Sequence, residues 1–69
     1  MNLKEVLQKL VDDGNSVLLN DGDKISNAAD LLQSLSDLTL NRKAHIQHGL
    51  YIAEINDAGY LGKVLYKFI

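Results

Sequence analysis

The chain has 69 residues, 46% of them hydrophobic, no cysteine and a formal net charge of −2. This composition excludes a disulfide framework, a thiolate metal site and an intrinsically disordered chain, because disorder requires lower hydrophobicity. A chain of this length forms one small domain, residues 1–69, which buries only ~60% of the surface that it exposes when unfolded. Small domains without disulfides or metals enlarge their core by regular packing or by oligomerisation, so we expect self-association.

Charge is distributed unevenly along the chain. Residues 1–41 contain seven carboxylates and three lysines, whereas residues 42–69 contain four cationic side chains, both histidines and two carboxylates. This uneven distribution of charge indicates what kinds of partner the protein can bind, and it says little about the fold. No apolar run approaches the ~20 residues of a membrane span, and the first residues have mixed charge rather than the pattern of a signal peptide. We therefore expect a cytoplasmic protein without a membrane segment.

The first predicted element is a helix that begins after Asn2 and ends near Gly14. Asn2 suits the N-cap position, and Glu5 stands where a capping box requires it. Gly14 can adopt the left-handed conformation that ends a helix. The apolar residues recur every three or four positions and form one stripe: Leu3, Val6, Leu7, Leu10 and Val11.

A strand and a second helix follow. Residues 16–20 are apolar in the middle and bounded by turn residues, which indicates a strand, and residues 21–23 form a turn. Asn27 is the predicted cap of the second helix, and residues 39–43 connect that helix to the rest of the chain. The predicted apolar face of the second helix comprises Ala28, Leu31, Leu32, Leu35 and Leu38.

Residues 44–69 predict a long β-hairpin with arms 44–55 and 60–69 and a turn at 56–59. A positive φ at Gly59 gives a three-residue loop with a glycine bulge, in which Asn56 faces Tyr60 and paired residue numbers sum to 116. This register separates a core face from an opposite face. The core face comprises Ile46, His48, Leu50, Ile52, Val64, Tyr66 and Phe68. The opposite face comprises His45, Gln47, Tyr51, Ala53, Ile55, Leu61, Lys63, Leu65, Lys67 and Ile69.

The predicted elements occur in the order α-β-α-β-β. We predict an α+β domain in which two helices pack on one face of a small antiparallel sheet dominated by the C-terminal β-hairpin. No internal repeat, linker or low-complexity segment divides the chain.

Catalytic and metal sites are not expected from this sequence. Residues 20–26 are rich in aspartate, but placing Gly22 at the sixth position of a calcium loop puts Val17 and Leu19, which have no oxygen ligand in their side chains, at the first and third positions. His45 and His48 are three residues apart, so on a strand they point to opposite faces. The chain has no cysteine nucleophile, and its length leaves little room for an enzymatic cleft. We therefore expect no enzyme activity, no cofactor and no metal.

The hairpin face away from the helices is the predicted interaction surface. It carries more apolar groups than so small a protein leaves in water, interleaved with lysines. Pairing of two copies, sheet face on sheet face or edge on edge, would bury these groups and leave the lysine ammonium groups solvated. Partial cover by residues 39–43 is the alternative for a monomer. The predicted interface comprises Tyr51, Ile55, Leu61, Lys63, Leu65, Lys67 and Ile69.

Two functional hypotheses follow. The first is a non-catalytic protein-interaction module, a small regulator or inhibitor that binds a macromolecular partner as a homodimer. Its acidic surface for a basic protein partner comprises Asp12, Asp13, Asp21 and Asp23. The alternative is a single-stranded nucleic-acid-binding protein, in which Tyr51, placed diagonally between Lys63 and Lys67, stacks on bases. The negative net charge argues against this alternative, because nucleic-acid-binding domains are usually basic.

Overall fold

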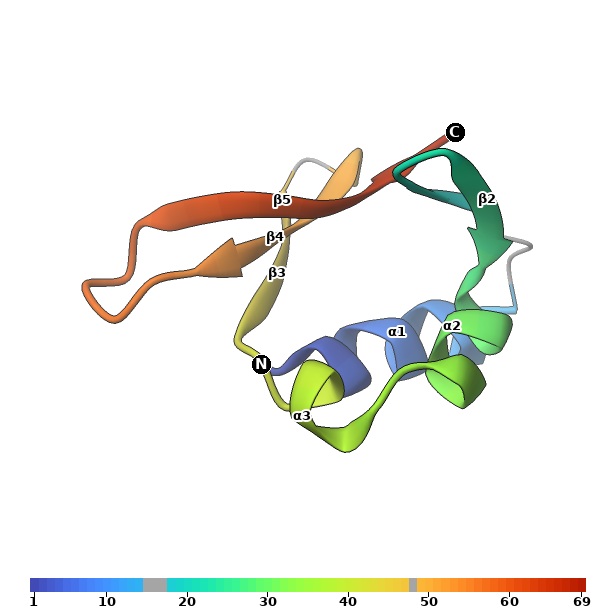
Figure 1. Ribbon diagram of the computed structural model, residues 1–69, viewed down its shortest axis with the longest axis horizontal. Helices are drawn as coiled ribbons and strands as arrows, with labels where there is room; N and C mark the ends of the chain where they lie inside the picture. The colour runs from blue at the N-terminus through green and yellow to red at the C-terminus, as the bar shows by residue number, and fades with distance from the viewer. Residues whose placement is uncertain (15–17, 48) are drawn as a thin grey trace.

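The computed structural model describes residues 1–14, 18–47 and 49–69. Five strands form one antiparallel sheet in the order β2-β1-β5-β4-β3, and Figure 1 shows the three helices on the same side of it. The α+β class, with helices on one face of an antiparallel sheet, is confirmed. The structure has two strands and one short helix beyond the predicted order. The elements are α1 (Leu3–Asp12), β1 (Leu18–Asp21), β2 (Lys24–Asn27), α2 (Ala28–Ser34), α3 (Asp37–Leu40), β3 (Ala44–Gln47), β4 (Tyr51–Ile55) and β5 (Leu61–Phe68).

Helix α1 forms as its sequence predicts. The Glu5 amide donates to Oδ1 of Asn2 at 2.9 Å, which caps the first turn. After the helix, Gly14 has a φ of 72°. The predicted stripe faces the core, with Leu3, Val6 and Leu7 buried and Leu10 and Val11 packed against them.

The first residues of the chain also pair with the backbone at one edge of the sheet. The Leu3 amide donates to the Arg42 carbonyl at 2.8 Å, and the Ala44 amide donates to the Met1 carbonyl at 2.9 Å. These bonds flank a bridge between Asn2 and Lys43, at the entrance to β3. The beginning of the β3 edge is therefore occupied by the chain itself.

Strands β1 and β2 form a tight hairpin, of which β2 was not predicted. The predicted strand 16–20 corresponds to β1, although residues 16 and 17 lie outside the described residues. The predicted turn is confirmed, with a φ of 64° at Gly22. Lys24 to Asn27 then pair with β1 before Asn27 caps α2, where its Oδ1 accepts from the Asp30 amide at 2.8 Å. A single residue thus ends the strand and begins the helix.

The predicted second helix is interrupted. Leu35 is extended, with ψ at 146°, and the Ser36 side chain then accepts a hydrogen bond from the Thr39 amide to begin α3. Assigning Leu38 to the buried face was wrong, because its side chain is 87% exposed while Leu40 enters the core. The cause is the serine, which caps a new helix better than it continues an old one.

The predicted hairpin arm 44–55 is two strands, β3 and β4. Gly49, with a φ of 67°, lies between them, and the Leu50 amide donates to the Gln47 carbonyl at 3.1 Å. Leu50 lies in this turn and is exposed, so assigning it to the core face was wrong. His48, assigned to the same face, lies outside the described residues.

The turn between β4 and β5 is confirmed, but the register changes along the strands. Gly59 has a φ of 85°, and the Asn56 amide donates to the Tyr60 carbonyl at 3.0 Å. Farther from the turn, β5 contains two residues that have no partner in β4. The numbers of two paired residues therefore add up to 117 and then to 118, instead of the predicted 116. Because side chains alternate between the two faces, a total shift of two residues returns the last residues of β5 to their predicted faces. The observed pairs are Ile55–Leu61, Ala53–Val64, Ile52–Tyr66 and Tyr51–Lys67.

The core lies between the helices and the inner face of the sheet. Ile52 and Leu19 are fully buried there, and Tyr66 and Ile46 pack beside them. Val64 was assigned to the core face, yet its side chain is 41% exposed, because it lies in the irregular part of β5. Among the described residues, no helix is long and apolar enough to cross a membrane.

Candidate interaction surface

The outer face of the sheet carries a row of side chains that crosses all five strands. Leu19 and Ser26 point to the helices and are buried, so their neighbours Asn20 and Ile25 point to the opposite face. The strand register aligns these two residues with three others. The cross-strand row, in the order of the strands β2, β1, β5, β4 and β3, is Ile25, Asn20, Lys67, Tyr51 and Gln47.

This cross-strand row has a distinctive chemistry. It contains an aliphatic group, two amides, one ammonium group and one phenol, and no carboxylate. The phenol of Tyr51 donates to Oε1 of Gln47, which joins β4 to β3 across the outer face. Ile25 and Lys67 are exposed, whereas Tyr51 is half-buried. The row is therefore mostly polar and able to form hydrogen bonds, with one positive charge at its centre.

A recess adjoins the row where β5 leaves β1. Its volume is about 280 Å³. In the part of the chain that the structure describes, two residue pairs join β1 to β5, and the bulged part of β5 lies next to them. The recess is large enough for one side chain of a partner. It is lined by Asn20, Gly22, Val64, Leu65 and Lys67.

The two register shifts move Lys63 away from Tyr51. Lys67 lies directly opposite Tyr51, whereas the predicted register put Tyr51 diagonally between Lys63 and Lys67. Lys63 instead follows Gly62, where the two strands approach closely. A Cβ atom at Gly62 would lie 3.2 Å from the Glu54 carbonyl oxygen. The predicted arrangement of one aromatic ring between two lysines is therefore not formed.

The other predicted interface residues are spread along β4 and β5. Ile55 and Leu61 oppose each other near the turn, in the part of the hairpin that Figure 1 shows projecting from the body of the protein. Leu65 packs partly against the core. Ile69 is exposed at the other end, where its amide donates to the Leu18 carbonyl at 3.2 Å. The predicted surface is thus a line along the hairpin rather than a compact patch.

The four predicted acidic residues form two separate pairs. Asp12 and Asp13 lie at the end of α1, whereas Asp21 and Asp23 lie at the β1–β2 turn. Strand β1 separates these places, and Figure 1 shows the turn away from the helix end. The structure does not bring the four carboxylates into one surface.

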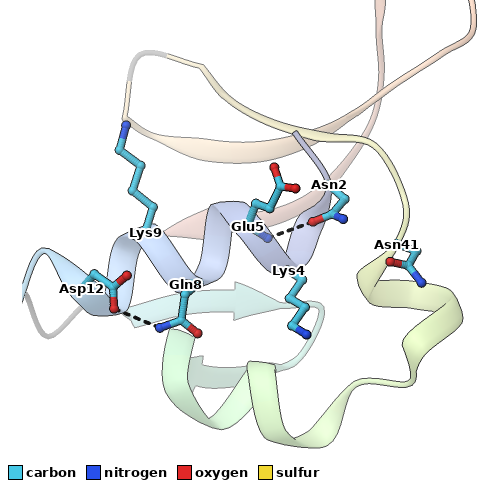
Figure 2. A pocket seen from close by; sticks show the side chains of 7 residues that line it. All are labelled: Asn2, Lys4, Glu5, Gln8, Lys9, Asp12 and Asn41. Carbon is cyan, nitrogen blue, oxygen red and sulfur yellow. Dashed lines mark hydrogen bonds between the residues drawn. The ribbon is translucent and has the colours of Figure 1, made fainter.

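A further hollow lies on the helical side, between α1 and α3, with a volume of about 580 Å³. Its polar side chains serve the helix itself: Asn2 caps the first turn, and Nε2 of Gln8 donates to Oδ1 of Asp12 at 2.9 Å. In Figure 2, Lys9 points to the opposite side of α1 from Lys4 and Gln8. The lining groups diverge, so they provide no convergent site for a small ligand. The lining residues are Asn2, Lys4, Glu5, Gln8, Lys9, Asp12 and Asn41.

Two features of the titratable groups can be described. Burial, and to a smaller extent the Asp21 carboxylate, raise the pKa of Tyr66, so this phenol of β5 stays neutral. Arg42 and Glu54 form an ion pair at 2.8 Å near the start of β3. Over residues 1–14, 18–47 and 49–69, no three His, Cys, Asp or Glu side chains are grouped to hold a metal ion.

Strands β1 and β2 also contribute to the outer face, which was not predicted from the sequence. Ile25 is 61% exposed, and Leu18 and Ile69 are exposed close to one another. The available signal was a turn at residues 21–23 with an apolar residue on each side, which is the pattern of a short β-hairpin. The outer face is therefore wider than the C-terminal hairpin alone.

Comparison of the chain with protein-family models, with curated proteins and with solved structures finds no match.

Proposed function

We propose that the protein is a non-catalytic interaction module, which acts as a homodimer and binds a protein partner through the outer face of its sheet. One observation carries this proposal. The helices cover one face of the sheet, while the other face keeps the cross-strand row, which includes the exposed Ile25, and two further exposed apolar side chains, Leu18 and Ile69.

The composition of the outer face supports a protein as partner. The centres of protein interfaces are depleted of charge and enriched in aromatic residues, and Tyr51 stands in the row beside a single ammonium group. The recess beside Lys67 offers a place for one partner side chain. A carboxylate opposite Lys67 would complement the only charge in the row.

Single-stranded nucleic acid is the second candidate, favoured by the direct opposition of Tyr51 and Lys67. Its support is weaker. Stacking surfaces present successive aromatic rings to successive bases, and the row offers one ring that is half-buried and bonded to Gln47. Protein binding is therefore the better-supported proposal.

Reversal of the charge at Lys67 tests this proposal. The natural protein and the Lys67→Glu variant are each used to capture the partner from extracts of the native cell. We expect the variant to retain at least about tenfold less of the partner, which corresponds to a loss of ~1.4 kcal/mol in binding free energy. The matched control is Lys4→Glu, which makes the same change on the helical side and is expected to retain the partner fully. Capture is measured by quantitative mass spectrometry after nuclease treatment.

Two outcomes contradict the proposal. Equal loss in both lysine variants would show a general effect of charge instead of a surface on the sheet. Binding of a single-stranded oligonucleotide that weakens steeply with salt, and that Lys67→Glu abolishes, would assign the outer face to nucleic acid.

A further inference from the structure

We infer that two copies of the chain join through the free edge of β2, with Ile25 of one copy paired with Ile25 of the other. This inference deepens the homodimer of the proposed function, on which it rests, by naming the contact. It also leaves the cross-strand row of each copy free for a partner.

The two edges of the sheet differ. The edge at β3 is partly occupied, because the Met1 carbonyl accepts from the Ala44 amide and the Leu3 amide donates to Arg42. Strand β2 forms the other edge and pairs only with β1 in the described part of the chain. Unpaired strand edges are templates for another strand, and proteins usually protect them with proline, bulges or charges. Strand β2 has no bulge in its pairing and no proline, and carries one charged residue, Lys24.

The hydrogen-bond pattern shows which groups β2 offers. A two-residue loop, Gly22 and Asp23, connects the paired residues Asp21 and Lys24. The pair that closes such a loop is hydrogen-bonded, and bonded and non-bonded pairs alternate along an antiparallel ladder. The Ile25–Asn20 pair is therefore non-bonded. It follows that the N–H and C=O groups of Ile25 both point away from β1, toward the free edge.

A second copy is the occupant that suits this edge. A two-fold axis perpendicular to the sheet brings β2 against itself in antiparallel orientation and keeps the outer faces on the same side. Pairing Ile25 with Ile25 then forms two backbone hydrogen bonds and a cross-strand contact between two exposed isoleucines. In this register Lys24 faces Ser26, and Asp23 faces Asn27. No like charges are directly opposed.

The expected affinity is modest. Strand β2 has four residues and therefore offers a short edge, so the area buried in the dimer falls at the small end of specific interfaces. We expect a dissociation constant on the order of micromolar. The dimer joins two five-stranded sheets into one continuous sheet. Its outer face carries two cross-strand rows.

A cysteine at position 25 tests the contact, because the natural chain has no cysteine. Residues in a hydrogen-bonded antiparallel pair have Cα atoms ~5.5 Å apart, which lies within the range for a disulfide. We expect Ile25→Cys to form a disulfide-linked dimer in high yield under mild oxidation. The control Leu38→Cys, on the exposed side of α3, is expected to stay largely monomeric under the same conditions.

A charge at the axis provides the second test. We expect Ile25→Lys to weaken self-association at least about tenfold, because two ammonium groups would meet. Leu38→Lys makes the same change at an exposed position and is expected to have no effect. If the natural chain dimerises but both Ile25 variants behave like their controls, the β2 contact is wrong while the homodimer stands. If the natural chain is monomeric at all concentrations, the homodimer itself is wrong.

Discussion

Replacement of Ile52 with alanine is expected to lower the free energy of unfolding by about 3 kcal/mol, which is the middle of the range for buried aliphatic residues. Ile52 is fully buried in β4 and lies between Ile46 of β3 and Tyr66 of β5. Its side chain fills the centre of the inner sheet face beneath the helices. The loss combines the transfer of the removed carbons with the cavity that they leave.

Equilibrium denaturation in urea, followed by circular dichroism, measures this loss. The control is Leu38→Ala, whose side chain is 87% exposed and whose truncation is expected to change stability by less than about 0.5 kcal/mol. A 69-residue domain has a small total stability, so Ile52→Ala is expected to be partly unfolded without denaturant. A loss below about 1 kcal/mol for Ile52→Ala would contradict the position of the core.

Replacement of Leu19 with alanine is expected to release the β1–β2 hairpin from the domain, at a cost of about 3 kcal/mol. Leu19 is the buried side chain of β1, and it pairs with Phe68 of β5 and Ser26 of β2. Among the described residues, β1 joins β5 through two residue pairs, and the Ile69 amide adds a hydrogen bond to the Leu18 carbonyl. Because this pairing is short, we expect the hairpin to depend strongly on the burial of Leu19 in the core.

Hydrogen exchange separates this effect from general destabilisation. We expect the amides of β1 and β2 to lose more protection in Leu19→Ala than those of β4. The matched control is Leu18→Ala, which truncates the neighbouring leucine on the outer face and is expected to leave protection nearly unchanged. Because β2 provides the proposed dimer edge, Leu19→Ala should also weaken self-association. Uniform loss of protection across the sheet would show that the hairpin is not a separate unit.

Much of the local structure was predictable because the signals were short-range. Asn2 and Asn27 cap their helices through the amides three residues on, and such caps are visible in the spacing of residues. The glycine turn at Gly59 was predictable for the same reason. The fold class followed from these elements and from the apolar stripe of α1.

The errors arose where two local signals competed or where the pairing was irregular. Ser36 lies within the predicted second helix, although it caps α3 and thereby exposes Leu38. Gly49 was included in a continuous strand, although its positive φ ends β3. The two bulges of β5 insert unpaired residues into the strand, and no alternation of hydrophobic residues in the sequence marks where they occur.

The candidate surface was predictable only in part. Tyr51 and Lys67 lie on the outer face, as the alternation of the hairpin indicated, but Lys63 does not join them. The contribution of Asn20 and Ile25 depends on the pairing of β1 with β5, which brings together residues nearly fifty positions apart in the sequence. Such long-range pairing cannot be read from local composition.

The most direct test of the central claim is the molar mass of the natural chain by sedimentation equilibrium, over a range of concentrations. The monomer mass is 7.6 kDa. We predict that the mass rises toward twice this value as the concentration passes through the micromolar range, and that added nuclease has no effect. A mass of 7.6 kDa at every concentration up to about 1 mM would contradict the homodimer, because any remaining affinity would be weaker than ~4 kcal/mol.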